Sequence, residues 1–182
     1  LNFRGPLIEA LIAAGHDDIA GAPNIDAECE ARLKALGARC IDVPMSRTGT
    51  NPLKDLATYN HLRRVIRETK PDYVLTYTIK PNIWGGLAAK ACGIRSAAMI
   101  TGLGYAFSDS DATSLRQRIV GGLARKLYAA AARHHSKLIF QNTDDRDDFA
   151  RAGCLDAPSK VIFTAGSGVD MELISPSPLP LN

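Results

Sequence analysis

The sequence has 182 residues, of which 46% are hydrophobic and 6% aromatic. This length suits one well-buried domain, and the composition excludes a disordered or fibrous chain. Lys and Arg outnumber Asp and Glu by 22 to 19, an excess too small to indicate a nucleic-acid-binding protein. We therefore expect one soluble globular unit.

The cysteines and the apolar segments exclude further classes. Cys29, Cys40, Cys92 and Cys154 lie far apart and form no C-x-x-C pair, so they predict neither a zinc site nor a small disulfide framework. No segment approaches the roughly 20 continuous apolar residues that a spanning helix needs. We expect no metal site, and neither a signal peptide nor a membrane-spanning helix in these residues.

Helical periodicity alternates with strand-like runs in the first half of the chain. Residues 4–14 predict a helix, with Pro6 in its first turn and Gly15 after its end. The next elements are, in chain order, a strand at 19–22, a helix at 26–36, a strand at 40–43, a polar loop at 46–52, a helix at 53–68 and a strand at 73–78.

The second half continues the alternation. It predicts a helix from Pro81 or Asn82 to Gly93, a strand at 96–101, a glycine turn at 102–104, a polar loop at 108–114, a helix at 115–134, a strand at 137–141, a helix at 143–152 and a strand at 160–164. This order predicts an α/β fold with a Rossmann-like parallel sheet and helices on both faces. Such a fold begins with a central strand, so we expect residues upstream of Leu1 to supply it.

Ligands bind such sheets beyond the carboxyl ends of the strands, which directs attention to the loops there. Lys80 and Asn82 follow the strand at 73–78 at a helix N-terminus, where an anion could bind. Helix capping by Asn82 and a solvated Lys80 are the alternative. Gly102-Leu103-Gly104-Tyr105 follows the next strand and would let a ligand approach the backbone. It lacks the third glycine of a dinucleotide fingerprint.

Two later segments have both a structural and a functional interpretation. Residues 166–170 are glycine-rich and predict a sharp turn or a hinge. The helix at 115–134 is basic and amphipathic, with Leu115, Ile119, Val120, Leu123 and Leu127 expected on its buried side. Its cations form either a solvated face or a surface for a membrane or a phosphate group; they are Arg116, Arg118, Arg125, Lys126 and Arg133.

Several motifs in combination resemble the N-terminal half of bacterial family 4 glycosyltransferases of the two-domain GT-B type. They are residues 3–7 (FRGPL), 15–16 (GH), 22–23 (AP), 76–82 (TYTIKPN), 100–107 (ITGLGYAF), 140–142 (FQN) and 166–170 (GSGVD). Within the family, the resemblance is strongest to enzymes that extend lipid-linked oligosaccharides in capsule, lipopolysaccharide O-antigen or protein-glycan assembly. It covers nearly the whole chain.

This resemblance implies an acceptor-binding domain over residues 1–174, followed by a linker over 175–182 to a C-terminal donor domain outside this chain. It implies a retaining sugar transfer that needs no metal or other cofactor. The donor is expected to be UDP-linked and the acceptor a saccharide on undecaprenyl diphosphate. We would then expect a cytoplasmic protein at the inner face of the bacterial plasma membrane, inactive as this chain alone.

The resemblance and the strand-end positions together give a set of candidate residues. The expected acceptor contacts are Arg47, Thr50, Asn51, Lys80, Asn82, Thr101, Gly102, Gly104 and Tyr105, the interdomain hinge is Gly166, Ser167, Gly168 and Asp170, and the membrane-facing cations are those of the helix at 115–134. No catalytic residue is assigned. The alternatives are a non-catalytic α/β module that binds an anion or a sugar, and a nucleotide-cofactor oxidoreductase or epimerase.

Overall fold

The computed structural model describes residues 4–46, 51–103, 107 and 115–168, with only the backbone described at 115–118. The chain divides into two compact units. The smaller is formed by residues 1–42 with 165–182, and the larger by residues 43–164. The chain passes from one unit to the other after Asp42 and again after Thr164.

The smaller unit contains α1 (Gly5–Ala13), β1 (Ile19–Ala22), α2 (Ala27–Ala35) and β2 (Arg39–Asp42). The two strands pair in parallel, with Ile19 opposite Arg39. Asp26 begins α2, because its carboxylate accepts a hydrogen bond of 2.7 Å from the backbone N–H of Cys29.

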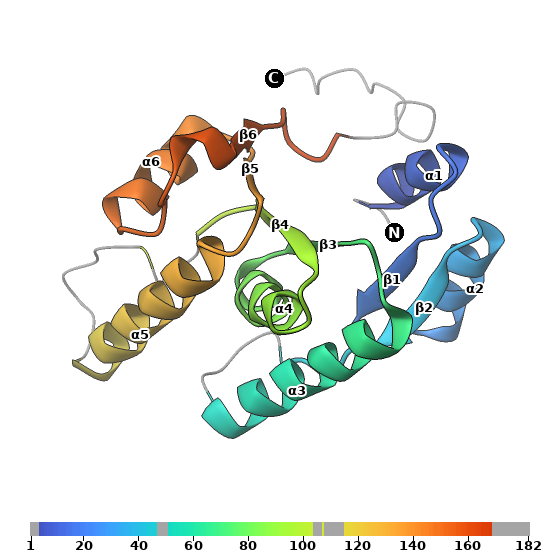
Figure 1. Cartoon of the computed structure of the whole chain (residues 1–182), viewed down its shortest axis with the longest axis horizontal. Helices are drawn as coiled ribbons and strands as arrows, with labels where there is room; N and C mark the ends of the chain where they lie inside the picture. Colours follow the sequence, from blue (N-terminus) through green and yellow to red (C-terminus); the bar gives the residue numbers. More distant parts are fainter. Residues whose placement is uncertain (1–3, 47–50, 104–106, 108–114, 169–182) are drawn as a thin grey trace, which may run out of the picture. The chain divides into compact units, whose positions relative to one another are not determined.

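The larger unit contains a four-stranded sheet in the order β3-β4-β5-β6, and every neighbouring pair is parallel. Figure 1 shows α4 between α3 and α5, and α4 packs against both of these helices. The elements are α3 (Pro52–Thr69), β3 (Tyr73–Tyr77), α4 (Ile79–Ala91), β4 (Arg95–Ile100), α5 (Leu115–Ala132), β5 (Lys137–Phe140), α6 (Thr143–Arg151), a 3-10 turn at Pro158–Lys160, and β6 (Val161–Phe163).

The predicted parallel-sheet α/β fold is confirmed, and each predicted helix and strand is observed within a few residues of its expected bounds. The largest difference at a helix start is in α4, which begins at Ile79 rather than at Pro81 or Asn82. Thr78 turns the chain directly from β3 into the helix, so Pro81 falls within the first turn, where proline is tolerated. β1 and β3 each lie at one edge of the sheet they belong to. The further strand that we expect from residues upstream of Leu1 stays a prediction.

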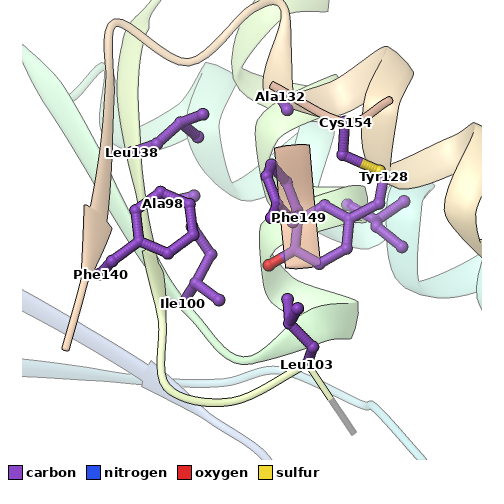
Figure 2. Packing of buried hydrophobic residues seen from close by; sticks show 10 residues of the cluster. Ala98, Ile100, Leu103, Tyr128, Ala132, Leu138, Phe140, Phe149 and Cys154 are labelled. Atoms are coloured by element: carbon purple, nitrogen blue, oxygen red, sulfur yellow. The ribbon is translucent and has the colours of Figure 1, made fainter. Parts of the chain in front are cut away.

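The core of the larger unit forms where α5 and α6 meet the sheet. Figure 2 shows Phe140, Phe149 and Tyr128 gathered with Ile100 and Leu138. The ring of Phe149 lies edge-on to those of Tyr128 and Phe140, with centroids 5.0 and 5.6 Å away. Edge-to-face pairs of this kind are favourable beyond the apolar area that they bury.

The expected buried side of α5 is wrong at Ile119 and Leu123, whereas Leu127 packs against the core as expected. Ile119 is 63% exposed and Leu123 is 56% exposed, whereas Tyr128, Ala131 and Ala132 are buried. Tyr128 follows Ile119 by nine positions, which at 3.6 residues per turn places the two on opposite faces of the helix. The large ring of Tyr128 and the small alanines fit the space against the sheet, so Ile119 and Leu123 face outward.

His135 cross-links three parts of this unit from a fully buried position. Its Nδ1 lies 2.9 Å from the Ser96 hydroxyl, and its Nε2 lies 2.9 Å from the backbone oxygen of Asn82. Because a carbonyl can only accept, Nε2 donates and Nδ1 accepts from Ser96. Burial lowers the pKa of His135, so the ring is held neutral. A side chain at Gly86 would overlap this ring, which explains a glycine inside α4.

We expect the stability of the protein to decrease as the pH falls. The unfolded chain takes up a proton on this histidine below its ordinary pKa of 6.5, whereas the folded protein resists it. The free energy of unfolding should therefore fall between about pH 7 and about pH 5 in urea titrations. A His135→Gln variant should be less stable at neutral pH but lose less stability over this interval. If the free energy of unfolding fell equally with pH in both proteins, His135 would not be the group responsible.

Candidate functional site

The loops after β3 and β4 lie next to each other at the carboxyl edge of the sheet. Tyr77 is the partner of Met99 in the register of these strands. Lys80 follows the first strand and Thr101 and Gly102 follow the second, so three of the predicted site residues lie just beyond the carboxyl ends of neighbouring strands. With Asn51, placed below, these residues are called the edge cluster.

Lys80 forms an ion pair that joins the starts of two helices. Its Nζ donates to Oδ1 of Asp55 at 2.8 Å, and the two side chains are only 19% and 17% exposed. Asp55 lies in the first turn of α3, where a negative charge also interacts favourably with the helix dipole. Lys80 is therefore held in place at the edge, with its charge partly balanced.

Asn51 is the residue that caps α3. Its side-chain oxygen accepts from the backbone N–H groups of Leu53 and Lys54 at 3.0 and 3.4 Å, and its backbone oxygen accepts from Asp55. Asn51 therefore lies one helical turn before Asp55, the ion-pair partner of Lys80. This places Asn51 near the carboxyl edge of the sheet. Capping accounts for an asparagine here without any ligand.

The N-terminus of α4 is unusually built. Thr78 has φ 68° and ψ 165°, a region that only glycine enters without strain, and it makes no side-chain hydrogen bond to cap the helix. Pro81 brings no N–H, so the donors of the first turn are the backbone groups of Ile79 and Lys80. Together with the helix dipole, they create a positive potential at the edge.

Gly102 gives the second loop its shape. Its φ is 132°, and open space surrounds the position where a side chain would begin. The next residue, Leu103, is 5% exposed and belongs to the core. The loop is therefore anchored on one side of Gly102 and open on the other, which suits the close approach of a ligand to the backbone.

Asn82 has a different role from the predicted one. Its side chain is completely buried, and its amide nitrogen donates to the backbone oxygen of Met99 at 3.0 Å and to the hydroxyl of Tyr128 at 2.6 Å. Burial raises the pKa of Tyr128, which keeps its hydroxyl neutral. Asn82 thus connects α4 to β4 and α5 from the interior and presents no surface to an acceptor.

The other predicted residues are only partly placed. Gly166 and Gly168 have positive φ values of 78° and 71°, and Ser167 between them accepts a hydrogen bond of 3.0 Å from Arg4. They follow closely after the passage between the two units at Thr164, and their role as a hinge stays a prediction. The remaining positions lie outside the described residues; they are Arg47, Thr50, Gly104, Tyr105 and Asp170.

A basic groove of about 520 Å³ lies along α5. Arg125, Lys126 and Arg133 line it together with small residues of α5 and the end of α6. The backbones of Arg116 and Arg118 belong to the same helix. Arg125, Lys126 and Arg133 are the charged residues of the lining, and no acidic residue is among the described residues that line it, so the groove suits anionic groups.

The described residues contain neither a membrane-spanning helix nor a cluster of metal ligands. No helix there is long and apolar enough to cross a bilayer, and no group of three or more His, Cys, Asp or Glu side chains could hold a metal ion.

Asp55, the ion-pair partner of Lys80 at the carboxyl edge of the sheet, is a residue that the sequence did not predict. Only the packing of α3 against α4, which brings Asp55 to Lys80, identifies it.

We expect Asn82→Ala to lower the free energy of unfolding by about 2–3 kcal/mol, because it removes two hydrogen bonds and leaves buried groups without partners. Tyr128→Phe keeps the bond to Met99 and should cost about 1 kcal/mol. Urea denaturation of the three proteins measures both effects. If Asn82→Ala were as stable as the unchanged protein, the structural role of Asn82 would be refuted.

Sequence comparison relates the chain to known proteins. It is 24% identical over 176 residues to an N,N'-diacetylbacillosaminyl-diphospho-undecaprenol alpha-1,3-N-acetylgalactosaminyltransferase of Campylobacter jejuni, and the match covers 96% of this chain and 45% of that protein. The chain therefore spans less than half the length of this relative.

Solved structures share the fold. Anabaena Alr3699/HepE in complex with UDP and glucose matches with a TM-score of 0.65 at 15% identity, over 98% of this chain and 44% of that one. MurG of Acinetobacter baumannii matches with a TM-score of 0.55 at 18% identity, over 91% of this chain and 42% of MurG. A UDP-N-acetylglucosamine 2-epimerase of Listeria monocytogenes matches equally well, with a TM-score of 0.55 at 16% identity, over 87% and 40%. Identities this low establish the fold alone.

The family is established by sequence. Residues 4–163, which include every helix and strand of the structure, match the model of the glycosyl transferase 4-like domain. The likeness to the Campylobacter transferase extends over nearly the same residues. The resemblance expected from the motifs is confirmed: the chain belongs to the glycosyl transferase 4-like family.

Proposed function

We propose that this chain is the acceptor-side half of a retaining glycosyltransferase, which moves a sugar from a UDP-linked donor to a lipid-linked saccharide. The observation that supports the proposal is the edge cluster within a chain of this family, because Lys80, Thr101 and Gly102 follow the carboxyl ends of neighbouring parallel strands, where open parallel sheets bind their ligands. The Campylobacter relative is by its name a transferase to a diphospho-undecaprenol acceptor, which supports the choice of acceptor.

The edge cluster offers suitable chemistry for holding an acceptor. Backbone N–H groups at the start of α4 and the Lys80 ammonium can bind hydroxyl or phosphate oxygens, while Gly102 allows a sugar ring to approach the chain. In the transfer, the acceptor oxygen forms the new glycosidic bond while the bond between the donor sugar and the diphosphate breaks. UDP leaves with the electrons of the broken bond, and the proton of the acceptor hydroxyl passes to the departing diphosphate. Fixing the acceptor accelerates this step by proximity.

We propose that a C-terminal domain outside these residues binds most of the donor, and that the transfer uses no metal ion or cofactor. Residues 1–174 would then form the acceptor domain and 175–182 the linker, with the hinge at 166–170. Assembly of surface polysaccharide, capsule or lipopolysaccharide at the cytoplasmic face of the plasma membrane is the proposed setting. A module that only binds an anion or a sugar is the second candidate, since the edge cluster by itself contains binding groups and no assigned catalyst.

A transfer assay with a panel of UDP-sugars and a short-chain undecaprenyl-diphosphate saccharide tests the proposal. We expect Lys80→Ala, in the full-length enzyme, to lower kcat/KM for the acceptor about tenfold or more through loss of charge at the edge. Lys90→Ala at the opposite end of α4, where Lys90 bonds to His134, is the matched control and should leave the rate unchanged. Equal rates for both variants would remove Lys80 from the site, and a folded protein that binds saccharide but transfers none would favour the binding module.

The basic groove on α5 is proposed to face anionic lipid at the membrane surface. We expect Lys126→Glu combined with Arg133→Glu to reduce binding to phosphatidylglycerol vesicles in flotation about tenfold or more, because each basic residue near an anionic surface contributes about 1 kcal/mol. Arg64→Glu with Arg67→Glu on α3 makes the same change of charge on exposed residues elsewhere and should have a smaller effect. Flotation that is indifferent to the α5 charges would contradict this role.

A further inference from the structure

The ion pair between Lys80 and Asp55 brings a cation and an anion together at the carboxyl edge of the sheet. Nζ of Lys80 lies 2.8 Å from Oδ1 of Asp55, and both side chains are mostly enclosed yet keep some contact with solvent. Within the described part of the chain, this is the one hydrogen bond that either side chain makes. An ammonium has three donors and a carboxylate has two acceptor oxygens, so bonding capacity remains on both partners.

The stability of the fold depends little on this pair. Asn51 already caps α3, and α3 packs against α4 through apolar side chains such as Tyr59 and Leu62. Ion pairs that keep contact with solvent contribute little to stability, because ordering and desolvating the two side chains offsets most of their attraction. A cation and an anion held together at the ligand-binding edge therefore favour a role in binding.

Side by side, the two groups match the hydroxyls of a sugar. A hydroxyl both donates and accepts, so one hydroxyl can donate to the free carboxylate oxygen while its neighbour on the ring accepts from the ammonium. An ionised phosphate oxygen only accepts, and beside Asp55 it would meet a negative charge that cancels much of the attraction of Lys80. The pair thus suits a neutral saccharide better than a diphosphate.

The loop after β4 offers room for a sugar ring. Apart from its chain neighbours, no atom of the described residues lies within 4 Å of the position where a side chain of Gly102 would begin. Because β3 and β4 are paired, Lys80 and Gly102 follow the ends of neighbouring strands. Polar groups that read hydroxyls are thus combined with an open stretch of backbone at the same edge of the sheet.

We propose that Asp55 determines the specificity for the acceptor. Its free carboxylate oxygen accepts a hydrogen bond from one hydroxyl of the terminal acceptor sugar, while Lys80 donates to the oxygen of an adjacent hydroxyl. The inference rests on the proposed function and narrows it, because it assigns this edge to the saccharide end of the acceptor rather than to its diphosphate. A sugar with two adjacent free hydroxyls is the expected ligand of the pair.

Asp55→Asn in the full-length enzyme tests the inference, because it removes the charge and keeps the size of the side chain. With the short-chain undecaprenyl-diphosphate saccharide of the transfer assay, kcat/KM for the acceptor should fall about tenfold or more, as expected for losing a hydrogen bond to a charged group. The KM for the UDP-sugar should stay unchanged. Asp156→Asn is the matched control and should leave the rate unchanged, since it breaks a similar ion pair of 2.7 Å with Lys160.

Acceptors that each lack one hydroxyl show whether Asp55 contacts the sugar or only holds Lys80 in place. With the unchanged protein, one of these deoxy analogues should react about tenfold or more slowly than the complete acceptor. In Asp55→Asn the two should react at nearly the same rate, because the partner of the missing hydroxyl is already gone. If the two losses multiplied for every analogue, the inference would be wrong. Asp55→Glu, which keeps the charge but displaces the carboxylate, serves in the same cycle if Asp55→Asn does not fold.

Other outcomes separate this inference from the proposed function. An unchanged or higher kcat/KM in Asp55→Asn would overturn the inference and leave the transferase proposal intact, because a site for the diphosphate would gain from losing a carboxylate. If the unchanged protein transferred no sugar, the transferase proposal would fail, and calorimetry with the same saccharide free of its diphosphate would still test the inference. Weaker binding by Asp55→Asn would then support it, and equal binding by both proteins would overturn it.

Discussion

The larger unit depends on the buried polar contacts of one residue, Asn82. Its side chain donates to Met99 and Tyr128, while its backbone oxygen accepts from His135. One position of α4 is thereby bonded to β4, to α5 and to the segment that leads into β5. Buried polar groups are costly unless they are paired, so few alternative arrangements of these elements can satisfy this set. The network therefore specifies how α4 sits against its neighbours.

The position of α4 in turn determines the edge cluster. Lys80 lies two residues before Asn82, so whatever holds the asparagine also fixes the lysine and the first turn of the helix. The ion pair between Lys80 and Asp55 fixes the start of α3 relative to α4. Leu103, which is buried in the core, fixes the loop at Gly102. The groups proposed to bind the acceptor are thus held in place by the fold itself, which would lower the entropy cost of binding.

Local patterns in the sequence were enough to predict the alternation of elements, the parallel sheet and the position of Lys80, because periodicity and strand-end loops depend on nearby residues. They failed where burial depends on distant parts of the chain. An asparagine after a strand resembles a surface residue until Tyr128, 46 positions later, is seen to bond to it. Ile119 and Leu123 likewise resemble core residues, and only the packing of Tyr128 and the alanines turns them outward.

Thr78 has a consequence for how such a protein can evolve. A β-branched residue at φ 68° and ψ 165° costs of order 1–3 kcal/mol, and glycine at this position would recover much of it. Selection for stability alone would thus favour glycine between β3 and α4. A more flexible turn, however, would make the start of α4 more mobile, so the backbone N–H groups of its first turn would be less well oriented. The strained threonine thus gives up some stability for a turn of fixed shape, so substitutions that stabilise this fold without loosening the start of α4 should be sought at other positions.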